Sequence, residues 1–74
     1  MAKMYRVQYW KDTSHNVFYH TDYEKARMRY LHWTTNQLME LDGIVWRVKL
    51  EELCRDGKYR TIFESKTFHD AMTL

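Results

Sequence analysis

Residues 46–64, WRVKLEELCRDGKYRTIFE, contain the signal that decides the fold. Before Asp56-Gly57, apolar and polar residues alternate with the period of a strand that buries one face. An Asp-Gly pair favours a type I′ hairpin turn, because both central residues of that turn need a positive φ. The stretch therefore predicts two antiparallel strands, near residues 44–54 and 59–66.

The register of this hairpin follows if Asp56 and Gly57 are its two turn residues. Apolar side chains then lie opposite apolar ones, and an opposite-charge pair crosses the strands, as in stable hairpins. The expected partners are Cys54 with Tyr59, Leu50 with Phe63, and Lys49 with Glu64.

A second hairpin is predicted at the start of the chain. Residues 4–10 are rich in strand formers and alternate between two faces. The polar residues 11–16 are typical of a hairpin loop, and residues 17–20 return as the second strand.

A helix is expected directly after this hairpin. Thr21 precedes Glu24 by three residues, the spacing at which each side chain can cap a backbone N–H of the other. Apolar residues then recur at helical spacing, which predicts a helix near 22–36. Weak helix formers follow, so its end is expected between Thr35 and Glu40.

The same order of elements returns in the second half of the chain. Thr67 begins another cap signal, which predicts a short helix over 68–73. Residues 4–40 and 44–74 are therefore interpreted as two ββα units. Their sequence similarity is weak, and both a duplication and a coincidence of amphipathic patterns explain it.

These elements predict a single α+β domain over residues 1–74, with ββα-ββα order. The expected architecture is a four-stranded antiparallel or mixed sheet, in strand order 2-1-3-4, with two helices packed on one face. The expected core residues are Tyr5, Val7, Phe18, Ala26, Tyr30, Trp33, Trp46, Val48, Leu50 and Phe63.

Size and composition limit the functions that this chain can have. A chain of 74 residues has room for one domain, which buries only about 60% of its unfolded surface, so a deep cleft is not expected. The net charge of +2 does not by itself indicate a nucleic-acid or membrane partner. The single Cys54 excludes a disulfide within the chain, and no apolar run has the length of a membrane span. A cytoplasmic protein is expected.

The residue types that carry chemistry do not form a catalytic or metal-binding pattern. The four histidines, at positions 15, 20, 32 and 69, lack a spacing that brings two of them to one ion. Cys54 has no predicted base nearby, and two glycines cannot form a phosphate-binding loop. We expect no catalytic residue, no metal site and no cofactor, and hence a protein that is not an enzyme.

The sheet face without helices is the candidate interaction site. Its predicted side chains mix aromatic, arginine and aliphatic groups, a composition typical of the centre of protein interfaces. The predicted partner-binding residues are Arg6, Trp10, Tyr19, Val45, Arg47, Lys49, Arg60 and Ile62.

Two functions are compatible with this face. The first is a non-enzymatic protein–protein interaction module that self-associates, which would also suit an accessory protein of a phage or mobile element. The alternative is single-stranded nucleic-acid binding, with aromatic rings stacking on bases and cations neutralising phosphates. Glu51 and Glu64, in the middle of the face, count against the alternative. A basic strip of Lys25, Arg29 and His32 on the first helix could also contact phosphates, although solvated helix faces commonly have this composition.

Overall fold

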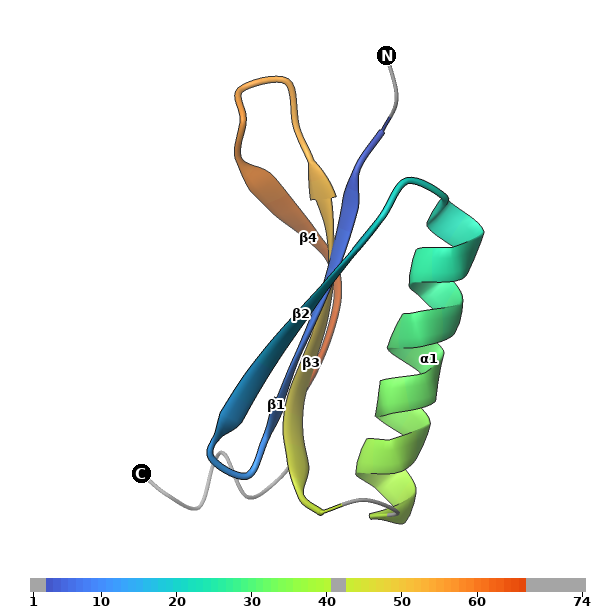
Figure 1. Ribbon diagram of the computed structural model, residues 1–74, viewed down its shortest axis with the longest axis vertical. Coiled ribbons are helices and arrows are strands. Elements are labelled where there is room, and N and C mark those ends of the chain that lie inside the picture. Colours follow the sequence, from blue (N-terminus) through green and yellow to red (C-terminus); the bar gives the residue numbers. More distant parts are fainter. Residues whose placement is uncertain (1–2, 41–42, 67–74) are drawn as a thin grey trace.

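The computed structural model describes residues 3–40 and 43–66, and these form one antiparallel sheet with a helix against one of its faces (Figure 1). The sheet order is β2-β1-β3-β4, as the sequence predicted. The strands are β1 (Tyr5–Lys11), β2 (Ser14–His20), β3 (Val45–Leu53) and β4 (Tyr59–Lys66), and α1 spans Tyr23–Met39.

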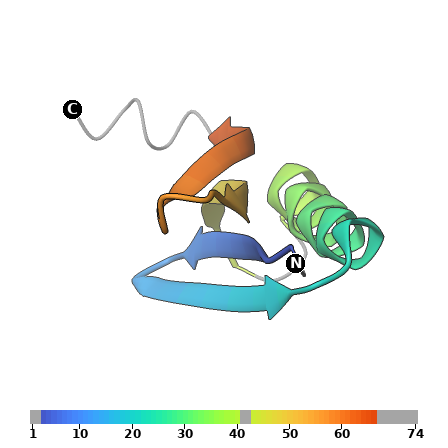
Figure 2. The same cartoon turned by 90° about the horizontal axis from the view of Figure 1, so that it is seen from above.

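The expectation of two helices on the sheet is corrected. The described residues contain four strands and one helix, so the fold is α+β with a single helix over one face (Figure 2). The second helix was expected over 68–73, which lies outside the described residues. All three strand pairings are antiparallel, so the sheet is not mixed.

The core lies between α1 and the sheet, where apolar side chains of β1 and β3 meet one face of the helix. The Tyr9 ring stacks on Trp33 of α1 with 3.7 Å between centroids, and Tyr5 meets Tyr23 edge to face at 5.4 Å. Burial of these groups is the main force that holds the two layers together. The buried apolar residues are Tyr5, Val7, Tyr9, Ala26, Val45, Val48 and Leu50.

Because of a β-bulge between β1 and β3, two residues lie on the opposite faces of the sheet from those predicted. Trp10 pairs with Arg47 whereas Lys11 pairs with Val45, so Trp46 is an extra residue on β3. A bulge changes which face the following side chains point to. Val45, expected on the uncovered face, is only 1% exposed in the core, and Trp46, expected in the core, lies beside Trp10.

A second bulge, between β3 and β4, compensates for a longer turn than predicted. Cys54 N–H donates to Lys58 O at 2.8 Å, which closes a three-residue loop with Gly57 at φ +83°. Leu53 therefore pairs with Tyr59, and the expected Cys54–Tyr59 pairing is wrong.

The extra residue on β4 is Ile62, and beyond it the predicted pairs are confirmed, Leu50 with Phe63 and Lys49 with Glu64. Ile62 packs against the core cluster on the helix side. Phe63 contacts Tyr30, but α1 lies mainly over β3 and β1, and Phe63 is 49% exposed. Its assignment to the core is therefore corrected.

The turns of the first half also differ from the prediction. β2 begins at Ser14, so the first hairpin has the short turn Asp12-Thr13, with Asp12 at φ 51°. The cap of α1 is Asp22 and not Thr21, because the Asp22 carboxylate accepts from the Glu24 N–H at 3.0 Å. The helix ends at Met39, within the predicted interval.

The identity of the cap can be tested by two neighbouring alanine substitutions. Asp22→Ala should lower the free energy of unfolding by about 1 kcal/mol, because the first turn of α1 loses an acceptor for an unpaired N–H. Thr21→Ala should have a smaller effect. Urea denaturation of both variants measures the difference, and a larger loss for Thr21→Ala would contradict Asp22 as the cap.

The limits of the core can be tested in the same way. Leu50→Ala should cost about 2–5 kcal/mol, because Leu50 is fully buried and its truncation leaves a cavity. Phe63→Ala, directly across the hairpin, should cost less, since half of its ring already contacts water. Equal losses in chemical denaturation would show that Phe63 is more deeply packed than the structure indicates.

Candidate functional site

We call the sheet surface opposite α1 the open face. Strand residues alternate between the two faces, so the register of the four strands and its two bulges assign the side chains of this surface. The open face comprises Arg6, Gln8, Trp10, His15, Val17, Tyr19, Trp46, Arg47, Lys49, Glu51, Leu53, Tyr59, Thr61, Glu64 and Lys66.

The structure brings five of the eight predicted partner-binding residues together on the open face. The other three lie elsewhere because of the two bulges and the longer β3–β4 turn. Val45 and Ile62 pack on the helix side, and Arg60 pairs with Glu52, whose strand partner on β1 is the core residue Tyr5. The five that share the open face are Arg6, Trp10, Tyr19, Arg47 and Lys49.

A buried carboxylate lies in the middle of this face. Glu51 is only 3% exposed although α1 does not cover it. Arg6 binds it with two parallel hydrogen bonds of 2.9 Å, and the amide of Gln8 donates a third to the same carboxylate. Lys49 Nζ lies 3.9 Å from it. A carboxylate can remain ionised in such a place because charge-assisted hydrogen bonds replace the lost water.

The side chains around Glu51 determine its ionisation. Burial alone would raise the pKa of Glu51, but hydrogen bonds from Arg6 and Gln8, together with the charges of Arg6 and Lys49, bring it below the usual 4.5. The hydrogen bond from Arg6 to Glu51 also raises the pKa of Arg6 above its usual value, against the opposing effect of burial. The Arg6 guanidinium lies over the Tyr59 ring, 3.8 Å from its centroid. Arg6 is thus held by a carboxylate and by a ring face.

A second cluster crosses all four strands. The Trp10 ring on β1 stacks on His15 of β2 with 4.5 Å between centroids and 9° between planes. On the β3 side the guanidinium of Arg47 lies 4.8 Å from the Trp10 centroid, and its Nε donates to Glu64 of β4 at 2.5 Å. Because β1 lies between β2 and β3, His15 and Arg47 cover opposite faces of the Trp10 ring.

The two clusters are connected through one amide. Gln8 donates from Nε2 to Glu51, and its Oε1 lies 2.8 Å from His15 Nε2. The open face therefore carries one continuous network that includes the buried carboxylate and the Trp10 stack. Trp46 extends it, with its ring centroid 6.0 Å from Trp10 and its indole N–H bonded to Asp12 O.

Sequence reasoning missed several members of this network. His15 was expected in a loop, although the three residues 14–16 form the beginning of β2. Tyr59 was placed opposite Cys54, and Trp46 was placed in the core. Val45 and Trp46 are both apolar, so the alternation pattern does not show which of the two side chains faces the core. Only the structure decides between them.

The described part of the chain shows no arrangement for metal chemistry. Among residues 3–40 and 43–66, no three His, Cys, Asp or Glu side chains lie close enough together to hold an ion. Within the same residues, α1 is neither long nor apolar enough to cross a bilayer. Comparisons with protein-family models, curated proteins and solved structures found no match to this chain.

The ionisation of Glu51 predicts a specific acid sensitivity. Its folded-state pKa is depressed, so its stabilising contribution is present above about pH 4.5 and is lost as the pH falls through the folded-state value. Glu51→Gln should be less stable than the wild type at pH 7, and this difference should shrink in acid. Urea denaturation between pH 7 and pH 2.5 measures both proteins. Parallel pH profiles would contradict the ionised, ion-paired Glu51.

Proposed function

We propose that this protein is a non-enzymatic protein–protein interaction module that self-associates through its open face. The observation that carries the proposal is the Trp10 stack, in which His15 and Arg47 hold an indole ring from both sides. Tryptophan and arginine side chains dominate the energy of protein interfaces, and a side chain that is already fixed loses little entropy on binding.

The same geometry favours a protein partner over single-stranded nucleic acid. A base stacks on an open ring face, whereas both faces of Trp10 are covered and Arg6 covers a face of Tyr59. The two arginines of the face are also paired with carboxylates, Arg6 with Glu51 and Arg47 with Glu64. Phosphate binding would have to compete with these ion pairs.

A second copy of the chain fits this surface in size and charge. The two longer extents of the molecule are 40 and 24 Å, and a standard interface needs about 800 Å² per partner. The face carries Glu64 together with cations such as Lys66, so two copies related by a two-fold axis can place opposite charges against each other. Tyr19, which is 59% exposed, and Val17 supply apolar surface on β2.

Self-association predicts a mass that depends on concentration and on Trp10. Trp10→Ala should weaken the dimer by roughly thirtyfold, because a central aromatic anchor is worth about 2 kcal/mol. Tyr19→Ala should weaken the dimer as well. Because the Tyr19 ring is exposed, its removal should not unfold the protein, so a weaker dimer would reflect a lost contact between the two copies. Sedimentation equilibrium measures both variants. Leu38→Ala is the control, since Leu38 is an exposed apolar residue of α1, away from the open face.

The nucleic-acid alternative is tested with the same protein and a labelled oligonucleotide at low and high salt. A self-associating protein should show little salt dependence and no oligonucleotide binding. A monomer that binds the oligonucleotide, with affinity falling steeply as salt rises, would contradict the proposal. A monomer that binds no oligonucleotide would contradict self-association.

A further inference from the structure

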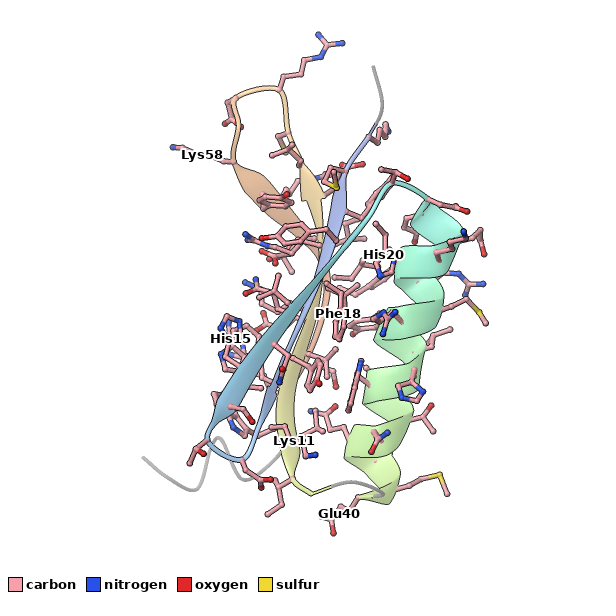
Figure 3. The ribbon with its side chains drawn as sticks, in the orientation of Figure 1. Lys11, His15, Phe18, His20, Glu40 and Lys58 are labelled. Carbon is pink, nitrogen blue, oxygen red and sulfur yellow. The ribbon has the colours of Figure 1, made fainter. Side chains whose placement is uncertain are left out.

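A groove of about 630 Å³ lies where the end of β2 meets the first turns of α1, on the helix side of the sheet. His20 belongs to β2 and points toward the helix, as does Phe18 beneath it (Figure 3). The other lining residues belong to α1. The groove is lined by His20, Glu24, Lys25, Met28, Arg29 and His32.

Arg29 is fixed in this groove by two contacts that leave its charge unpaired. Its Nε donates to His20 Nε2 at 3.2 Å, and its guanidinium lies 4.1 Å from the centroid of the Phe18 ring. Neither partner carries a negative charge, because one is the phenyl ring of Phe18 and the other is the imidazole of His20. A guanidinium held by a ring and an imidazole still has N–H donors for an anion.

The groove carries more positive than negative charge. Within the described residues, Lys25 and Arg29 form no ion pair, whereas the one acidic lining residue, Glu24, is paired with Arg27 at 3.3 Å. Burial lowers the pKa of His20, and the charges of Arg29 and Lys25 lower it further, while Asp22 opposes them. The imidazole therefore lies in a positive potential.

We propose that this groove binds the phosphate group of a small molecule. Arginine and lysine bind phosphate oxygens through charge-assisted hydrogen bonds, and the imidazole rings of His20 and His32 can add further donors. The groove is open to solvent, so it can admit a phosphate group without enclosing the rest of the molecule. A nucleic-acid strand fits less well, because the next cation along the helix, Arg27, is already paired with Glu24.

Titration with inorganic phosphate and with a nucleoside monophosphate, followed by NMR of the histidine ring protons, tests the inference. At constant ionic strength, His20 and His32 should shift with saturation, while His15 on the open face should not. A bound dianion should also raise the pKa of His20, because negative charge favours the imidazolium form. Stronger binding of the nucleotide would show contacts beyond the phosphate, and equal binding would assign recognition to the phosphate group alone.

Lys25→Gln is the decisive variant, since Lys25 makes none of the contacts that hold Arg29. It should weaken phosphate binding by about fivefold, the effect of one partly exposed ionic contact. Lys58→Gln is the matched control, because it removes the same charge from the β3–β4 hairpin, away from the helix (Figure 3). Thermal unfolding verifies that both variants are folded.

Two outcomes would overturn the inference. One is the absence of saturable shifts at His20 and His32 up to high phosphate concentration. The other is equal weakening by Lys25→Gln and Lys58→Gln, which would show a general charge effect and no site. Because the groove lies on the helix side of the sheet, neither result bears on self-association through the open face.

Discussion

The pairing of β1 with both β2 and β3 is the constraint on which the rest of the structure depends. A central strand has its whole backbone hydrogen-bonded, and its side chains must serve two different environments. On one side Val7 and Tyr9 lie in the core beneath α1. On the other, Arg6, Gln8 and Trp10 form the middle of the open face. A shift of this strand by one residue would exchange the two sets and remove both the core and the network.

The open face achieves burial without a covering layer. Glu51 is almost inaccessible because the long side chains of its neighbours lie over it, and Arg6 is in turn held against Tyr59. Such an ion pair adds little net stability compared with apolar residues of similar size, yet removing one partner leaves an uncompensated charge. Its effect is to fix the positions of side chains that would otherwise move freely, so the surface has a defined shape before any partner arrives.

Much of the fold could be predicted from the residues, because alternation in β1 and in the middle of β3 is regular. The strand order and the interval in which α1 ends are confirmed. Several errors fall where two apolar or two capping residues are adjacent, as in Val45-Trp46, Ile62-Phe63 and Thr21-Asp22. In each pair either residue satisfies the pattern, and only tertiary packing decides between them.

The candidate site was predicted less completely, because several of its residues follow turns whose lengths differ from the prediction. Arg6 and Trp10, on a regular strand, were placed correctly, whereas Arg60 and Ile62 follow a turn with one more residue than expected. The partners of Trp10 could not be derived, since stacking with His15 depends on the exact length of the first turn. Predicting both contacts of Trp10, with His15 and with Arg47, would require the register of β1, β2 and β3 together.

The bulge at Ile62 has a consequence for how the sheet ends. β4 is an edge strand, and a regular edge is a template on which further strands can add without limit. One extra residue interrupts the regular spacing of its ladder and increases its twist. Open-ended growth of fibres from that side is thereby discouraged. The extra residue that brings Ile62 into the core therefore also makes this edge of the sheet less regular.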